Sequence, residues 1–475
     1  MTGQVSNFAV FLGELAALAH IVIASAITLH VLLYKRDVGS AVAWIGIAWL
    51  SPFLGGLLYA IMGINRVKRR AQRLRRERLI TTDTAATLEI AASAATDPYS
   101  PLEFAIGRLT GLPCEDGNRI EMLHSGDQAY PRMLAAIEGA RHSVGLVSYI
   151  FRDDKAGEAF HKALIAARQR GVDVRVLIDG VGGGYFWSGT FQVLAKAGVP
   201  IARFLHSYLP WQMPFVNLRN HRKVLVVDGR LAFTGGLNIG AENIRADNPP
   251  AIVLDTHFQL EGPVVEQLTD AFADDWLYTT GERLLTDRWF PPLDKVGPVK
   301  ARVVTSGPDE DMEQIEFVAL HAISCAHKSI RVVTPYFLPP DPLTMALGLA
   351  ALRGVKVDIV LPEHSNHTIL DWARRVPLRP LIVSGCNVWL RPAPFDHSKL
   401  MVIDDQWSLI GSANWDTRSF RLNFELNVEL HDPAFAQQIV AATAASQRLQ
   451  LADLDNEPLP LRLRNGAARL LQPYL

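Results

Sequence analysis

The chain has 475 residues, enough for two or three domains of ordinary size, and its 47 lysines and arginines nearly balance its 48 aspartates and glutamates. The net charge of −1 excludes the strong positive field that nucleic-acid-binding proteins commonly carry. The three cysteines, Cys114, Cys325 and Cys386, are too widely spaced to predict a disulfide framework or a metal site, and no cofactor is expected.

The first 65 residues contain two long apolar segments. Neither the 20 residues from 15 to 34 nor the 28 residues from 38 to 65 include Asp, Glu, Lys or Arg. Such segments can cross a bilayer, so we predict a two-helix membrane hairpin with spans at about residues 12–34 and 41–63, the second kinked at Pro52. A hairpin that enters one leaflet is the alternative. A cleaved signal peptide is disfavoured because "MTGQVSNF" has no basic residue.

Basic residues flank this hairpin unequally. Eight lie between Arg66 and Arg78, whereas the turn between the apolar segments carries only Lys35 and Arg36. Because positive residues are retained on the cytoplasmic side of a membrane, we expect both ends of the hairpin to be cytoplasmic. The same block is also suited to attract anionic lipid headgroups.

Beyond this region apolar strands alternate with amphipathic helices. The segments "HSVGLVSYIF", "KAGEAFHKALIAARQRG" and "VDVRVLID" predict a strand, a helix closed by Gly171 and a second strand, which is the unit of a layered α/β domain. The same order recurs in "HKSIRVVTPYF", "PLTMALGLAALRG" and "VKVDIVLP", at offsets between 176 and 186 residues, which indicates a duplicated domain. We expect a membrane region, a connector and two halves packed about a pseudo-twofold axis, over residues 1–78, 79–130, 131–290 and 291–475.

Each half contains one copy of a polar motif, His-x-Lys-x4-Asp, followed by a small-residue turn that ends in Asn. The eight positions are His221, Lys223, Asp228 and Asn238 in the first half and His397, Lys399, Asp404 and Asn414 in the second. A single copy is typical of a solvated strand edge, but all four pairs are separated by 176 residues. Since strand residues two apart share a face, we expect each His and Lys to point together into one cleft between the halves.

Two lysines and two asparagines that face one another suit a phosphate with a single negative charge. Two histidines beside it can divide a two-step substitution, in which one attacks phosphorus and the other protonates the leaving oxygen. No metal is required for this scheme. The motif aspartates lie at the far end of each strand, so a supporting role is expected for them.

Each histidine also needs a partner that fixes its tautomer. Aligning the later strands "LDTHFQLEGP" and "NFELNVELHDP" on their prolines sets Asp255 opposite Glu425. We therefore expect Asp255 to orient His221 and Glu425 to orient His397, each within its own half. A structural salt bridge is the alternative role for either carboxylate.

The paired "HRKVLVVD" and "HSKLMVID" resemble the motifs of the phospholipase D superfamily. With the hairpin, "TPYFLP" and "GSANWDTRSFRLNFELN", the chain is similar to bacterial cardiolipin synthases along nearly its whole length. The resemblance implies that a phosphatidyl group moves from one phosphatidylglycerol to a histidine, glycerol leaves, and a second phosphatidylglycerol accepts it.

The resemblance also assigns roles and a location. It implies that His221 is the nucleophile and His397 the general acid and then base, with the motif lysines and asparagines on the phosphate. It places the protein in the bacterial cytoplasmic membrane, as a multi-pass protein with its catalytic part on the cytoplasmic side. One departure is Gly236, which stands where the second half has Ser412, so the first half is expected to lack a hydroxyl beside the phosphate.

Other functions remain open at this point. A hydrolase that releases phosphatidic acid would use the same residues, and only exclusion of water would distinguish it. A membrane-tethered nuclease is disfavoured by the balanced charge, and a scaffold without activity by the completeness of both motifs. The acceptor is either phosphatidylglycerol or phosphatidylethanolamine, and no pattern indicates the oligomeric state.

Overall fold

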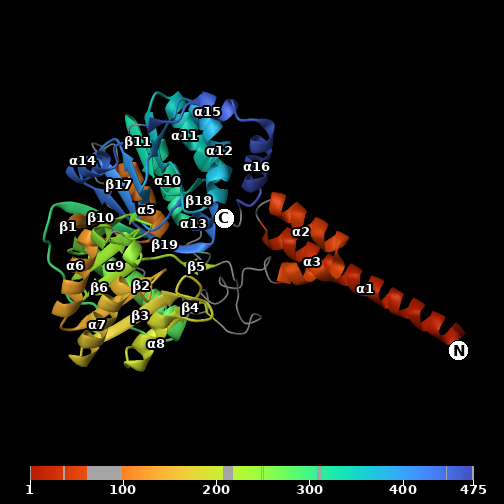
Figure 1. The fold of residues 1–475 in the computed structure, drawn as a ribbon, viewed down its shortest axis with the longest axis horizontal. Helices are drawn as coiled ribbons and strands as arrows, with labels where there is room; N and C mark the ends of the chain where they lie inside the picture. Colours follow the sequence, from red (N-terminus) through yellow and green to blue (C-terminus); the bar gives the residue numbers. More distant parts are fainter. Residues whose placement is uncertain are drawn as a thin grey trace. The chain divides into compact units, whose positions relative to one another are not determined.

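The computed structural model (Figure 1) divides the chain into two compact units. One unit contains the described residues up to residue 60, and the other, which we call the catalytic unit, contains the described residues from residue 99 onward. The structure describes residues 2–35, 38–60, 99–206, 218–247, 249, 251–307, 313–445 and 447–472.

The N-terminal unit contains three apolar helices, α1 (Thr2–Tyr34), α2 (Val38–Leu50) and α3 (Pro52–Leu58). Within α1, the 25 residues Val10–Tyr34 have a mean hydropathy of 2.1, and this is the one helix of the described residues long and apolar enough to cross a membrane. The predicted second span is interrupted at Ser51, because Pro52 lacks the N–H that would continue α2 and therefore starts a new helix. The 13 residues of α2 extend about 20 Å, less than the hydrocarbon core of about 30 Å.

Part of the hairpin prediction falls on residues outside those described. These are the end of the expected second span, residues 61–63, the basic block at 66–78 and the first part of the connector, residues 79–98. The later part of the connector belongs to the catalytic unit, where α5 (Ser100–Thr110) buries Leu102 and Ile106 in the hydrophobic core.

Most strands of the catalytic unit form one long sheet, whose strand order is similar in both directions from its centre, where β1 (Glu115–His124) pairs antiparallel with β10 (Val299–Ser306). Outward from β1 follow β9 (Thr256–Glu261), β7 (Leu231–Gly235), β6 (Val224–Val227), β2 (Ser143–Ser148), β3 (Asp173–Asp179) and β4 (Ile201–Phe204). Outward from β10 follow β19 (Asn423–His431), β17 (Trp407–Gly411), β16 (Leu400–Ile403), β11 (Ser329–Val333), β13 (Lys356–Pro362), β14 (Asn387–Arg391) and β20 (Gln447–Arg448). A pseudo-twofold axis therefore passes between β1 and β10, which confirms the duplicated α/β fold.

Each half contains the predicted strand–helix–strand unit. In the first, α7 (Lys155–Gln169) connects the parallel strands β2 and β3, and in the second α11 (Asp341–Leu352) connects β11 and β13. Gly171 and Gly354 follow these helices with φ of 87° and 92°, a conformation that favours glycine and ends a helix. The predicted helix end at Gly171 is thus confirmed.

Further helices pack around the sheet, as Figure 1 shows for each half. In the first half these are α6 (Ser125–Gly139), α8 (Gly189–Lys196) and α9 (Val264–Thr280). In the second they are α10 (Gln314–Cys325), α12 (Thr368–Val383), α13 (Thr417–Arg421), α14 (Pro433–Ala442), α15 (Leu451–Asp455) and α16 (Leu459–Arg469).

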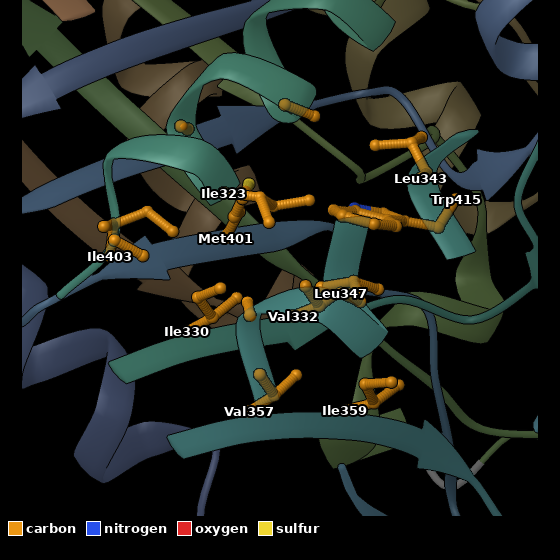
Figure 2. Packing of buried hydrophobic residues seen from close by; sticks show 14 of the residues in the cluster. Ile323, Ile330, Val332, Leu343, Leu347, Val357, Ile359, Met401, Ile403 and Trp415 are labelled. Carbon is orange, nitrogen blue, oxygen red and sulfur yellow. The ribbon is translucent and has the colours of Figure 1, made fainter. Parts of the chain in front are cut away.

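The hydrophobic core of the second half lies between its strands and the helices α10 and α11 (Figure 2). Strand residues two apart share a face, so alternate residues of β11, β13 and β16 meet the helices. The residues that Figure 2 labels are Ile323, Ile330, Val332, Leu343, Leu347, Val357, Ile359, Met401, Ile403 and Trp415. Full burial of each such side chain stabilises the folded state by about 1.5–3 kcal/mol relative to leaving it exposed. These contacts hold β16, the strand within the second motif, against the helices.

A test of the first half's packing uses Gly145 in β2. A Cβ atom added there would lie 2.6 Å from the ring of Phe272 in α9, closer than real contacts allow. We expect Gly145→Ala to lower the free energy of unfolding by about 1–3 kcal/mol, because the helix must move away from the sheet. The control is Gly139→Ala, where nothing lies within 4 Å. Equal denaturation midpoints for the two variants, measured on the whole chain in detergent, would contradict this packing.

Candidate active site

Both motif histidines lie in loops that are held by the opposite half of the catalytic unit. The two-residue strand β5 (Arg219–Asn220) pairs in parallel with β19, and β15 (Phe395–Asp396) pairs in parallel with β8 (Val253–Leu254). The N–H of His221 then donates to Phe424 O at 2.9 Å, and that of His397 donates to Leu254 O at 2.7 Å. Each half thus lends a short strand to the other just before its motif.

This exchange of strands decides which carboxylate meets which histidine. Continuing the β5–β19 register by one residue sets Glu425 against His221, and continuing the β15–β8 register sets Asp255 against His397. The side chains follow the backbone, with His221 Nδ1 3.0 Å from Glu425 Oε2 and His397 Nδ1 2.7 Å from Asp255 Oδ2. The predicted pairing within each half is therefore wrong, because each carboxylate serves the histidine of the other half.

The motif lysines lie in loops, whereas we predicted that they lie in strands. The central strands β6 and β16 begin at Val224 and Leu400, one residue after each lysine, so the His-x-Lys segments are loops rather than strand. Each lysine folds back to donate to the carbonyl oxygen of its own motif histidine, at 2.6 Å for Lys223 Nζ and His221 O. Both lysines are 2% exposed, so two amino groups are buried next to the histidines.

Burial sets the protonation of this site. Burial, aided by the charges of the lysines and opposed by the carboxylates, lowers the pKa of His221 and of His397 to about 4. Burial also lowers the pKa of Lys223 to about 7 and of Lys399 to about 8. The opposite trend holds for the carboxylates: burial raises their pKa, but the adjacent lysines and histidines outweigh it and leave both below their usual values. Neutral imidazoles therefore face ionised carboxylates.

The motif aspartates lie at the far end of the central strands and are absent from the cleft lining. Asp228 accepts hydrogen bonds from the backbone N–H groups of residues 141–143, and Asp404 from those of residues 327–329, which lead into β2 and β11. Asp404 also accepts from the hydroxyl of Tyr99 at 2.9 Å. This placement supports the predicted structural role, in which each aspartate ties its central strand to the neighbouring one.

The two motif asparagines, Asn238 and Asn414, line the cleft. The difference between Gly236 and Ser412, however, affects the carboxylates and not the phosphate side that we predicted. Ser412 Oγ donates to Glu425 Oε2 at 2.5 Å and accepts from Leu426 N at 3.0 Å, so this hydroxyl supports the carboxylate rather than the phosphate. At Gly236 an added Cβ would lie 2.2 Å from Asp255 Oδ1. The first half therefore excludes a serine because the shorter carboxylate occupies that space.

A cleft of about 1250 Å³ joins the two histidines, and it contains groups that the sequence reasoning missed. They are Tyr149, Arg219, Tyr336, Asn366, Asp416 and Arg418. The tyrosine rings stand edge-on to the histidines, with centroids 5.0 Å apart for Tyr149 and His221 and 5.9 Å apart for Tyr336 and His397. The sequence could have indicated these tyrosines, because each one follows the first strand of a repeated strand–helix–strand unit.

One group of possible metal ligands lies outside the cleft lining. The side chains of Cys114, Glu429 and His431 offer ligand atoms within 4.8 Å of one another. Glu429 already forms a buried ion pair with Arg302, and burial raises the pKa of the Cys114 thiol far above its ordinary value. The donor set is thus a poor match for a cation, because its carboxylate is neutralised and its thiol is held protonated.

Removal of one acceptor tests the role of the motif aspartates. Asp404→Asn replaces one carboxylate oxygen by a donor that opposes the backbone N–H groups, so we expect a loss of about 1–3 kcal/mol in the free energy of unfolding. The neighbouring, exposed Asp405→Asn should cost little. Denaturant unfolding of both variants in detergent would check this, and an unchanged midpoint for Asp404→Asn would contradict the assigned role.

The lowered histidine pKa values predict acid sensitivity with a defined window. Between about pH 6.5 and 4 the unfolded chain takes up protons on these imidazoles and the folded chain does not, so stability falls as the pH drops. The loss is on the order of 3 kcal/mol per histidine. A double variant, His221→Gln with His397→Gln, should show a shallower dependence of its midpoint on pH. The exposed His124→Gln should keep the slope of the unsubstituted protein, and an identical slope in the double variant would be contrary to expectation.

Comparison with known proteins agrees with this geometry. The family model described as cardiolipin synthase, PLD-like domain, matches residues 133–276 and 319–444. The major cardiolipin synthase ClsA of Bacillus subtilis is 31% identical over 458 residues, which cover 93% of this chain and 95% of that protein. Cardiolipin synthase A of Pseudomonas entomophila is 34% identical over 439 residues, 90% of each chain.

A solved structure shares the fold. The phosphatidylserine synthase of Haemophilus influenzae Rd KW20 superposes with a TM-score of 0.59 at 17% identity, over 79% of this chain and all of that one. The family model covers both halves of the catalytic unit, and each match contains one complete motif. The chain therefore belongs to the cardiolipin synthase family of phospholipase-D-like proteins.

Proposed function

We propose that this protein is a membrane phosphatidyltransferase that converts two phosphatidylglycerol molecules into cardiolipin and glycerol. The observation that carries the proposal is that both motif histidines line one cleft, each held by a carboxylate of the opposite half and accompanied by a buried lysine. Relatives that are cardiolipin synthases by name, and similar over most of the chain, support the choice of substrate.

In the first step the neutral imidazole of His221 attacks the phosphorus of one phosphatidylglycerol. Its Nδ1 hydrogen bond to Glu425 leaves Nε2 free as the nucleophile, since a carboxylate partner fixes the protonated nitrogen. A bond forms between Nε2 and phosphorus while the bond from phosphorus to the glycerol oxygen breaks. His397 donates a proton to that oxygen, and glycerol leaves.

In the second step the histidines exchange their parts. His397, now neutral, accepts the proton of a primary hydroxyl on the second phosphatidylglycerol as this oxygen attacks phosphorus. The phosphorus–nitrogen bond breaks, and cardiolipin leaves with His221 restored. Asp255 holds His397 in one orientation for both transfers, because a carboxylate on Nδ1 stabilises the imidazolium that forms and decays.

Binding of the lipid explains how His397 gains the proton that this scheme needs. In the empty cleft both imidazoles are neutral, with pKa values of about 4, whereas a general acid must carry a proton. A phosphodiester anion between the two lysines favours their charged forms and that of His397, since opposite charges at close range raise a base's pKa. Substrate binding thus protonates the acid, while the empty site stays neutral.

We also propose the arrangement of the chain in the membrane. The helix α1 and the uncharged second segment, residues 38–65, would form a multi-pass anchor within residues 1–78, with the basic residues on the cytoplasmic side. The two halves, residues 131–290 and 291–475, would then act on the inner leaflet of the bacterial cytoplasmic membrane. Nucleic acid is not a proposed partner.

The proposal is tested with the whole protein in mixed micelles that contain phosphatidylglycerol with a labelled headgroup. We expect cardiolipin and free labelled glycerol in equal amounts from the unsubstituted protein. His221→Ala and His397→Ala should each lower the rate by at least about 10³-fold, because the two histidines act as a unit.

The control is His124→Ala, which removes an exposed histidine outside the cleft lining and should leave the rate unchanged. Phosphatidic acid as the sole lipid product would replace the transferase by a hydrolase. Turnover that persists in either active-site variant would contradict the two-histidine site.

A further inference from the structure

Two arginines lie in the cleft beyond the motif lysines. Arg219 is in β5, two residues before His221, and Arg418 is in α13; the side chains of both line the cleft. They come from opposite halves of the catalytic unit, as the two histidines do. Neither belongs to the two His-x-Lys motifs, and the two-step scheme above gives neither a part.

Tyr149 connects these arginines to the reacting centre. Its ring stands edge-on to His221 with centroids 5.0 Å apart, and it lines the cleft together with both arginines. Burial raises the pKa of its hydroxyl, and the charges of Arg219 and Arg418 oppose this rise. The pair therefore adds two positive charges to the cleft that contains the nucleophile.

The chemistry of the product requires such a place. Cardiolipin carries two phosphodiesters joined by one glycerol, so the acceptor lipid brings a second anion to within a glycerol's length of the reacting phosphorus. In the scheme proposed above, the two motif lysines already balance the charge of the first phosphate. A planar guanidinium matches phosphate oxygens with two parallel hydrogen bonds, which makes arginine suited to hold the second.

We propose that Arg219 and Arg418 bind the phosphodiester of the acceptor lipid while its glycerol hydroxyl attacks the phosphohistidine at His221. This subsite rests on the function proposed above and extends it, because it explains selection of an anionic lipid over water or free glycerol as acceptor.

The acidic groups near this pair are held by other partners. Asp179 accepts from the backbone N–H groups of residues 181, 182 and 220, and Asp416 accepts from Ser419 N at 2.7 Å as the cap of α13. On the cleft lining, Glu242 forms an ion pair with Arg152 at 2.7 Å. Asp179 also attracts Arg219, and Asp416 attracts Arg418, so these acids offset part of the positive charge of the pair in the empty cleft.

The test separates the acceptor from the donor half of the reaction. With unlabelled phosphatidylglycerol and labelled free glycerol, the first step and its reversal exchange label into the lipid, with a neutral acceptor that has no phosphate. Cardiolipin formation requires the second anionic lipid. We expect Arg219→Gln and Arg418→Gln each to lower cardiolipin formation more than tenfold and to leave glycerol exchange within about threefold.

Two further variants sharpen the result. Arg418→Lys keeps the charge without the planar fork and should recover part of the cardiolipin rate. Arg379→Gln removes an exposed arginine that pairs with Asp455 outside the cleft lining, and should change neither rate.

Three outcomes would overturn the proposal. A parallel loss of exchange and cardiolipin formation would assign the arginines to the donor phosphate or to folding. Unchanged rates in both assays would exclude them from lipid binding. Absence of cardiolipin with the unsubstituted protein would instead overturn the proposed function itself, and the acceptor subsite with it.

Discussion

The active site depends on the exchange of two short strands between the halves of the catalytic unit. β5 pairs with β19 and β15 pairs with β8, and the backbone hydrogen bonds determine which residue lies opposite which. Buried contacts reinforce the exchange: Arg222, between the motif His and Lys, pairs with Asp275 at 2.9 Å and donates to Glu425 O at 3.1 Å. The backbone pairing therefore positions both members of each histidine–carboxylate pair, and little side-chain freedom has to be lost to bring them into contact.

Charge balance explains how so many ionisable groups can be buried together. Two lysines and two carboxylates compensate one another around two neutral imidazoles, so the empty cleft carries little net charge from these six groups. Isolated buried charges would be expensive, whereas paired and hydrogen-bonded ones are tolerated. In the proposed reaction a bound phosphate adds negative charge to this balance, which favours the charged forms of the lysines and the protonated form of His397.

The sequence was informative where the signal is local or repeated. The twin motifs and the strand–helix–strand units recur at nearly constant offsets, so the fold class and the eight motif positions could be read directly. Asp255 and Glu425 were found by alignment, but their partners were assigned wrongly because an exchange between halves leaves no periodic pattern. The break at Pro52 exceeded the expected kink, since hydropathy does not report helix continuity. Tyr149 was overlooked because a single aromatic residue after a strand is usually core.

The crossed pairing has a consequence for biosynthesis. Each histidine–carboxylate pair has one member in each half, so a nascent chain that has folded only its first half contains His221 but not Glu425, which follows it by 204 residues. Domains tend to fold in order as they are made. Neither histidine can therefore meet its carboxylate until the strands of both halves have been made, so the candidate site is completed only when the two halves assemble.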